Sequence, residues 1–370
     1  MQNGDVKAAD FLEQEFRKNG LQPLRGDYRQ PFTFNVNVIK KTPKLIINGK
    51  PLVAGRDFIV GAESPSGKGN SHVITIRNKP PETKWSADTS GRIFFIDIKS
   101  ELKDSISSYT RQWKMRPIHP RCYVFAEDKL TWTARQKQFR EPGFNVLRNV
   151  LPDAIKKIKY EVKSELISHQ AYNITATVPG IYADSFIFIT AHYDHLGRMG
   201  DVIFPGANDN ASGTSMLMDL AKTYACAKDK PKYTMVFVGF AGEEAGLIGS
   251  EYMANHPPVP LANIRFLLNL DLMGSGDEGL SVVNGLKFKE EFAILDSINS
   301  KEQLLVKLNQ GGEAKNSDHY HFTEKGVHSF FCFTLGGSKA YHDIYDRCEV
   351  ITLSRYPQVF TLLKKFLDQL

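Results

Sequence analysis

The sequence has no long apolar run and few cysteines, and both absences narrow what this protein can be. A helix that crosses a membrane needs about 20 predominantly apolar residues, so we predict no membrane span. The four cysteines form no C-x-x-C pair, which excludes the usual zinc-knuckle and dithiol redox motifs. We expect them to be small buried apolar side chains, and the sequence leaves open whether two of them form a disulfide.

Strong charge of one sign is also absent. The formal net charge is +6 over 370 residues and the isoelectric point is about 8.9. There is no arginine-rich run and no aromatic–glycine signature of an RNA-binding module, so we expect no nucleic-acid partner. Short basic clusters such as "KKIKYEVK" (156–163) are typical of solvated faces. Nothing in the sequence indicates an oligomeric state.

Length and texture instead predict two folded units. Residues 1–34 include a helix at 5–19. Residues 35–160 contain short alternating apolar runs between polar turns, which is typical of a β-rich inserted domain, with a helix or two near 141–158. From residue 161 to 370, β-branched and aromatic runs alternate with helical segments. The predicted fold class is therefore α/β, with a mostly parallel mixed sheet flanked by helices.

Polar side chains follow the predicted strands of residues 161–370. "SFIFIT" is followed by "AHYDHLG", "YTMVFVGF" by a glutamate pair and "IRFLLNL" by an aspartate, while "GANDNASG" precedes a helix and "GGSKAYHD" follows "HSFFCFTL". Ligands of open α/β sheets bind outside the carboxyl ends of the strands, so we expect these groups to meet. The candidates are His192, Asp209, Asp271, His342 and one or both of Glu243 and Glu244.

This set of side chains favours a metal centre. Two imidazoles and three carboxylates suit Zn²⁺, with Co²⁺ or Mn²⁺ as possible substitutes. A single catalytic zinc usually takes three protein ligands and keeps one open position. Two ions that share a bridging carboxylate, about 3.5–4 Å apart, need about five ligands. The sequence therefore predicts a two-metal centre.

The glutamate pair need not have one shared role. Adjacent residues of an extended chain point to opposite sides, so one of Glu243 and Glu244 can bind a metal while the other faces the substrate as a general base. Any one of these residues, taken alone, is more often structural than catalytic. Five of them at strand ends, flanked by small residues, favour a functional site.

The segments "AHYDHLG", "GANDNASG", "GFAGEEAGLIGS", "LNLDLMG" and "YHDIYD" resemble the five ordered motifs of the di-zinc aminopeptidase family. That family includes secreted bacterial leucine-type aminopeptidases, with glutamate carboxypeptidase and the transferrin receptor as distant relatives. The resemblance covers roughly residues 160–370 and the helix at 5–19. It implies a catalytic domain at 161–370 and a protease-associated domain inserted at 35–160. It also implies a periplasmic or secreted protein whose leader is absent from this chain.

Carried over to this sequence, the resemblance assigns each metal ligand. Asp209 would bridge two zinc ions. His192 and Asp271 would complete one site, and Glu244 and His342 the other.

The resemblance implies further roles near these ligands. Glu243 would be the general base and acid, and Tyr341 would donate to the developing oxyanion. Asp194 would fix the ring of His192, and the peptide bond Asp209–Asn210 would be cis. Asp318 in "NSDHYHF" is a lesser candidate for a direct role, followed by His319. The other histidines considered are expected to be structural or surface groups: His195, His256, His321 and His328.

The implied activity is hydrolysis of the N-terminal peptide bond of peptides with a free N-terminus, whose ammonium group a carboxylate-rich pocket attracts. One alternative is a glutaminyl cyclase-type zinc acyltransferase, which shares much of the ligand set. Another is a non-catalytic binding protein on the same fold. The "DNASG" helix entry and the long insert favour the peptidase over the cyclase. The complete ligand set and the base argue against a purely binding protein. Side-chain specificity is not indicated.

Overall fold

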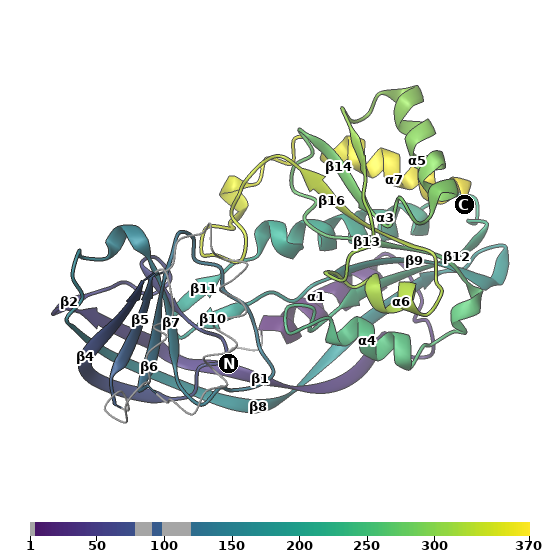
Figure 1. Ribbon diagram of the computed structural model, residues 1–370. Helices are drawn as coiled ribbons and strands as arrows, with labels where there is room; N and C mark the ends of the chain where they lie inside the picture. Colours follow the sequence, from purple (N-terminus) through teal and green to yellow (C-terminus); the bar gives the residue numbers. More distant parts are fainter. Residues whose placement is uncertain (1–3, 78–90, 98–119) are drawn as a thin grey trace.

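The computed structural model describes residues 4–77, 91–97 and 120–370 (Figure 1). Its helices are α1 (Gly4–Lys18), α3 (Gly213–Ala225), α4 (Ile248–Asn255), α5 (Lys289–Glu302), α6 (Tyr320–Glu324) and α7 (Tyr356–Gln369). The strands of the first half are β1 (Arg29–Ile47), β2 (Lys50–Pro51), β3 (Phe58–Val60), β4 (Gly67–Arg77), β5 (Ile93–Asp97), β6 (Cys122–Glu127), β7 (Gly143–Leu147) and β8 (Lys157–Val178). The strands of the second half are β9 (Tyr182–His192), β10 (Gly197–Met199), β11 (Val202–Phe204), β12 (Tyr233–Phe240), β13 (Ile264–Leu270), β14 (Gly279–Val283), β15 (Leu308–Gln310) and β16 (Ser329–Leu335).

The second half is built on a mixed sheet. Its strand order is β15-β14-β16-β13-β9-β12-β8. The four strands β16, β13, β9 and β12 run parallel to one another, whereas β8 pairs antiparallel with β12, and β14 pairs antiparallel with β16. Helices cover the sheet, as Figure 1 shows. The predicted fold class is confirmed.

Both faces of this sheet are buried, which explains why its strands read as continuous apolar runs. On β9, Ile187 and Ile189 pack into the core that contains α1, α3, α5 and α7. The alternating Phe186 and Phe188 face a second core with α4 and α6. Because successive side chains of a strand point to opposite faces, one short apolar strand supplies both cores. Polar residues lie instead at the carboxyl ends of the parallel strands, where β9 ends at His192 and Asp271 follows β13.

The first half forms a separate core, linked to the second by a two-stranded ribbon. Strands β4, β5, β6, β7 and β3 continue the sheet beyond β8, and residues such as Phe95 and Phe144 fill their core. The long strands β1 and β8 pair along most of their length and run through both halves (Figure 1). The predicted divisions at 34/35 and 160/161 lie inside these two strands. The division into domains therefore stays a proposal, as does the identification of a protease-associated domain.

The expected helix near 141–158 is wrong. This region contains β7, a short 3₁₀ turn (Arg148–Val150) and the start of β8. In β7, Phe144 and Val146 are buried and alternate with half-buried residues, which is strand periodicity. Pro152 lies two residues after the 3₁₀ turn and disfavours a helical conformation of the residue before it.

The cysteines depart in part from expectation. Cys122 and Cys332 are buried, but Cys226 and Cys348 are exposed because they lie at the end of α3 and in a surface 3₁₀ turn. All four are free thiols. Within the described part of the chain, no helix is both long and apolar enough to cross a membrane.

Candidate metal centre and active site

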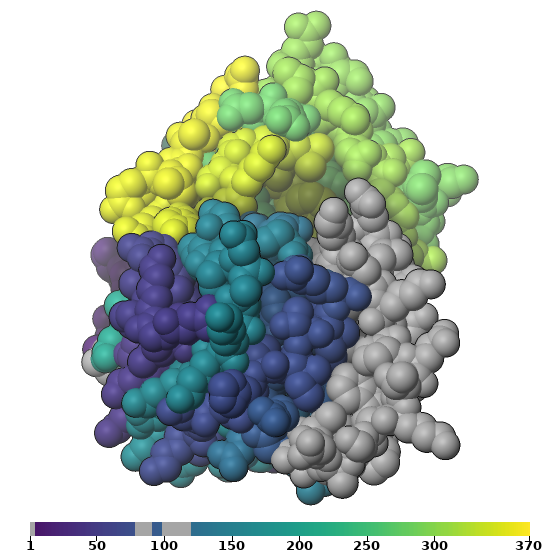
Figure 2. All heavy atoms as spheres, turned by 60° about the vertical axis from the view of Figure 1, so that its left-hand side comes forward, coloured from purple at the N-terminus to yellow at the C-terminus, as the bar shows by residue number. Residues whose placement is uncertain are grey.

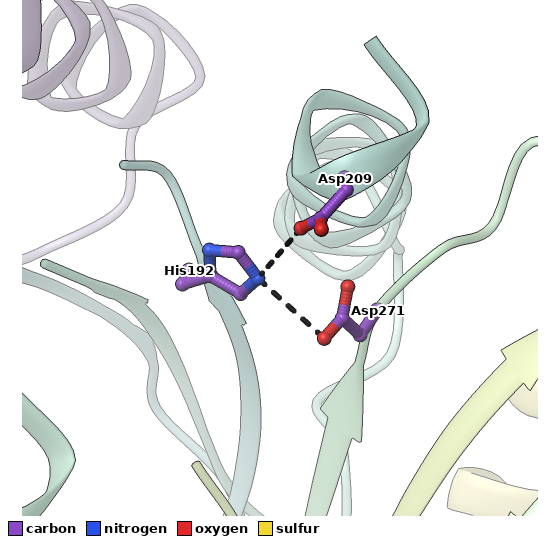
Figure 3. A group of neighbouring side chains, drawn as sticks. All are labelled: His192, Asp209 and Asp271. Atoms are coloured by element: carbon purple, nitrogen blue, oxygen red, sulfur yellow. Dashed lines mark ion pairs between the residues drawn. The ribbon is translucent and has the colours of Figure 1, made fainter. Parts of the chain in front are cut away.

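His192, Asp209 and Asp271 form one compact group, and they come from three separate elements (Figure 3). His192 is the last residue of β9, Asp271 directly follows β13, and Asp209 lies in the turn Ala207–Ser212 that precedes α3. Nε2 of His192 lies 3.4 Å from Oδ1 of Asp209 and 3.5 Å from Oδ2 of Asp271. All three side chains are buried. The strand order thus brings together residues that are far apart in sequence.

A second group shares Asp209. Its Oδ2 lies 3.0 Å from Nε2 of His342, and the same nitrogen lies 3.2 Å from Oε2 of Glu244. His342 has a positive φ of 53° in the loop after β16. The two oxygens of Asp209 therefore face different imidazoles, and all five predicted ligands lie in one neighbourhood.

Hydrogen bonds to Asp346 and Leu270 hold the turn that carries Asp209 in place. The N–H groups of Asn208 and Asp209 donate to the two carboxylate oxygens of Asp346 at 2.9 and 3.0 Å. The peptide bond between Asp209 and Asn210 is cis, as the resemblance implied. The side chain of Asn210 spans the gap to the neighbouring strand by donating to the carbonyl of Leu270 at 2.9 Å. These contacts position the Asp209 carboxylate between the two imidazoles.

His195 is a member of this cluster that sequence reasoning placed among structural or surface groups. Its Nδ1 approaches Oε1 of Glu244 to 2.7 Å, and His195, Asp209 and Glu244 offer ligand atoms within 4.8 Å of one another. Gly206 makes room for the ring, because a Cβ at that position would lie 2.4 Å from Cγ of His195, and its φ of 68° favours glycine. A signal was present, since His195 follows His192 by three residues in "AHYDHLG".

Asp194 has a different contact from the one expected. Nδ1 of His192 lies 3.1 Å from the main-chain carbonyl of Asp194, whereas the nearer carboxylate oxygen is 3.9 Å away. That carboxylate instead accepts the backbone N–H groups of Glu243 and Glu244 at 3.2 and 3.3 Å. Asp194 therefore orders both the ring of one predicted ligand and the turn that carries the glutamate pair.

Glu243 and Glu244 differ in their surroundings. Both line the pocket, but Glu244 is buried between two imidazoles, whereas Glu243 is half-buried. Burial raises the pKa of Glu243 well above its usual value, and the carboxylates of Asp318, Asp271 and Glu244 raise it further against the opposing effect of nearby His192. A half-buried carboxyl group with a raised pKa has the properties of a proton carrier.

Asp318 does not line the pocket. It is fully buried, and burial raises its pKa to about 7. His319 is buried as well, and burial lowers its pKa to about 4, which favours the neutral ring. His319 does not line the pocket either.

The pocket above the cluster has a volume of about 230 Å³. Tyr341 lies on its wall, with its ring stacked on His342 at a centroid distance of 4.0 Å. Burial, with added repulsion from the carboxylates, raises the pKa of Tyr341, so its hydroxyl keeps its proton. Thr133 and Arg135 also line this pocket. These two residues come from the first half of the chain and were not predicted as part of the site.

The electrostatics of the cluster favour a cation. Burial alone would lower the pKa of His342, but Asp209 and Glu244 raise it to about 10. Burial also raises the pKa of Asp209, with further repulsion from Asp271 and Glu244. Oδ1 of Asp271 is buried without a hydrogen bond to any described residue. Imidazole nitrogens and carboxylate oxygens are the ligands that zinc takes in catalytic sites, so these residues fit zinc.

Comparison with known proteins agrees with this reading of the motifs. The sequence model of peptidase family M28 matches residues 173–367, which is more than half of the chain. Aminopeptidase YwaD of Bacillus subtilis is 31% identical over 189 residues, which cover 48% of this chain and 39% of YwaD. A probable zinc metalloprotease of Leptosphaeria maculans is 40% identical over 115 residues, which cover 29% of this chain and 26% of that protein. The chain thus spans well under half the length of these curated relatives.

Solved structures share the fold at low identity. A peptidase M28 precursor from Shewanella amazonensis superposes with a TM-score of 0.77 at 17% identity, over 99% of this chain and 88% of that one. A zinc aminopeptidase from Bacillus subtilis superposes with a TM-score of 0.72 at 19% identity, over 100% of this chain and 89% of that one. The strand-end motifs, the mixed sheet and the family match lead to one conclusion: the chain belongs to peptidase family M28.

Proposed function

We propose that this protein is a metal-dependent aminopeptidase that uses two zinc ions. The observation that carries the proposal is the position of Asp209, whose Oδ1 faces His192 and whose Oδ2 faces His342. A carboxylate that turns one oxygen toward each of two ligand groups has the arrangement of a bridge between two ions. The relatives point the same way, since YwaD is named an aminopeptidase.

The ligand set divides around this bridge. His192 and Asp271 would hold one ion, and Glu244 and His342 the other. When bound, the ions supply Lewis-acid activation of a water molecule and of the scissile carbonyl. Co²⁺ or Mn²⁺ suits the same nitrogen and oxygen donors.

Glu243 is the residue we assign to proton transfer. Both glutamates line the pocket, but Glu243 is half-buried there, whereas the carboxylate of Glu244 is buried against the imidazoles of His195 and His342. The carboxylate of Glu243 takes a proton from the attacking water and returns it to the leaving amine. The raised pKa of Glu243 favours holding that proton between the two transfers.

Two features position the substrate. The carboxylates around the pocket attract the free α-ammonium group of a peptide, which fixes cleavage at the first peptide bond. The Tyr341 hydroxyl, protonated and on the pocket wall, is placed to donate to the carbonyl oxygen as charge develops there. We also propose that residues 35–160 form a protease-associated-like insert that shapes this pocket.

Hydrolysis of leucine p-nitroanilide by the zinc-loaded protein, with and without a chelator, tests the proposal. We expect chelator-sensitive release of p-nitroaniline and no release from the N-acetylated substrate. Glu243→Gln should retain zinc and lose at least about 100-fold in kcat, since general base catalysis contributes 10²–10⁴-fold. Two zinc ions per chain by elemental analysis are expected. Formation of pyroglutamate from an N-terminal glutamine peptide, with one zinc per chain, would instead indicate a cyclase.

A further inference from the structure

A segment of the first half of the chain forms one wall of the candidate active site. Trp132 is bonded to His342 in both directions, since its N–H donates to the His342 carbonyl at 2.8 Å and its carbonyl lies 3.0 Å from His342 Nδ1. Four residues later, the Gln136 side chain donates to the carbonyl of Ala245, next to Glu244, at 3.2 Å. In Figure 2 the teal part of the chain that follows residue 120 lies directly against the yellow C-terminal part. The segment 132–136 is thus fixed at both ends to the metal-site loops.

Arg135 lies between these two anchors and lines the pocket. Its carbonyl accepts the N–H of Asn37 in β1 at 2.9 Å, which fixes its backbone as well. Among the described residues that line the pocket, Arg135 is the one arginine or lysine. The pocket also contains the carboxylates of Asp209, Glu243, Glu244 and Asp271.

The guanidinium group of Arg135 makes only weak contacts with the rest of the protein. Its Nε lies 3.4 Å from Oε1 of Glu63, and the two side chains are 45% and 22% exposed. A long ion pair between partly exposed side chains contributes at most about 1 kcal/mol, so a better anionic partner can replace it. The other contact is the bond from Nη1 to the carbonyl of Ala134 at 3.1 Å, which leaves guanidinium donors for a ligand.

We propose that Arg135 binds a carboxylate of the substrate, so that the enzyme prefers short peptides with a negative charge close to the cleaved bond. The inference rests on the proposed aminopeptidase function and names its substrate class. The metal ions would neutralise the carboxylates on the floor of the pocket, and Arg135 on the wall would remain as a fixed positive charge. The pocket, of about 230 Å³, is small and suits a substrate of one or two residues.

The carboxylate can come from two sources with the same chemistry. One is the C-terminal carboxylate of a dipeptide, and the other is an acidic side chain in the second residue of a longer peptide. Both place an anion a few bonds beyond the scissile carbonyl. Matched neutral substrates separate them, because an amide removes the charge and keeps nearly the same shape.

The test compares kcat/KM for two pairs of substrates with the zinc-loaded protein. Leu-Gly against Leu-Gly-amide reports the terminal carboxylate, and Leu-Asp-amide against Leu-Asn-amide reports the side chain. For at least one pair we expect Arg135→Gln to lower kcat/KM about tenfold for the charged member, mainly through KM, and to leave the neutral member unchanged. Lys137→Gln removes the same charge from a neighbouring residue that does not line the pocket, and it should change neither pair.

The remaining outcomes are distinct. Equal losses on charged and neutral members, or no loss on any substrate, overturn the role of Arg135 while leaving the aminopeptidase intact. If the wild-type protein hydrolyses neither these dipeptides nor leucine p-nitroanilide, the proposed function fails. Calorimetric binding of Leu-Gly and Leu-Gly-amide then decides on Arg135 by itself. About tenfold weaker binding of Leu-Gly to Arg135→Gln supports it, and equal or absent binding overturns it.

Discussion

Trp132 and His342 are joined by a reciprocal pair of backbone-anchored contacts, although they lie in different halves of the chain. The Trp132 N–H donates to the His342 carbonyl at 2.8 Å, and His342 Nδ1 lies 3.0 Å from the Trp132 carbonyl. A carbonyl partner requires a proton on Nδ1, which leaves Nε2 free to bind a metal. The β-rich half of the chain thus selects the tautomer of the neutral His342 ring, a proposed metal ligand in the other half.

Trp132→Ala is therefore expected to weaken zinc binding at the site of His342. The indole stacks on Phe204 at 4.6 Å and donates to the Val60 carbonyl at 2.8 Å, so its loss releases the backbone that holds His342. Changes of this kind typically cost 10–100-fold in metal affinity. Zinc titration by equilibrium dialysis measures it. Phe144→Ala, in the same core, controls for lost stability of about 3–5 kcal/mol, and equal zinc affinity in both variants would contradict the prediction.

Asp209→Asn tests the bridge. The amide has one oxygen acceptor and no charge, so neither ion keeps its shared ligand. We expect both sites to lose zinc, with affinity falling more than about 100-fold, beyond the usual effect of a change outside the ligand shell. Elemental analysis after dialysis counts the ions. Asp201→Asn, at a carboxylate that is 91% exposed, should keep both. Retention of two ions by Asp209→Asn would mean that Asp209 does not bridge.

His195→Ala tests the residue that lies 2.7 Å from Glu244 Oε1. If His195 holds Glu244 so that Oε2 faces the ion, its removal should lower zinc affinity at that site about tenfold. His195→Gln should restore much of the affinity, because the amide can still donate to the carboxylate and is a poor zinc ligand. Failure of the glutamine to rescue would instead indicate that His195 binds the ion directly.

Zinc binding should release protons. In the metal-free protein the neighbouring carboxylates raise the pKa of His342 from 6.5 to about 10, so this ring is protonated at neutral pH and must lose its proton to bind zinc. Zinc affinity should therefore rise with pH between about pH 7 and pH 9. Calorimetry in buffers of different ionisation enthalpy measures the released protons, and an affinity that does not change with pH would contradict the prediction.

The same raised pKa has the opposite effect on the stability of the metal-free protein. A histidine with a raised pKa stabilises the fold fully below its unfolded pKa of about 6.5, and this contribution is lost as pH rises through about 10. Chelator-treated protein should accordingly lose stability over that range, which thermal unfolding at several pH values measures.

Local pattern was enough to find part of the site. His192 and Asp271 directly end or follow buried strands, and chain direction alone places such residues at one edge of the sheet. His342 lies farther from its strand, in a loop where it has a positive φ, and it was a candidate because its segment follows the strand "HSFFCFTL". Trp132 and Arg135 gave no local signal, because the long ribbon of β1 and β8 brings them to the site. Register between distant strands decides such contacts, and no short stretch of sequence contains it.

Asp194→Asn tests how the glutamate turn is held. The two carboxylate oxygens of Asp194 each accept one backbone N–H, from Glu243 and Glu244. An asparagine can accept only one of them, and its NH₂ group would meet the other N–H as donor against donor. Loss of one buried hydrogen bond to a charged group costs about 1–3 kcal/mol, and the turn should rotate to relieve the conflict. Because Glu243 must be positioned closely for proton transfer, kcat for leucine p-nitroanilide should fall about 10–100-fold. The exposed Asp201→Asn exchange gives the matched control. A kcat equal to that of the control would mean that the turn keeps its shape without the Asp194 carboxylate.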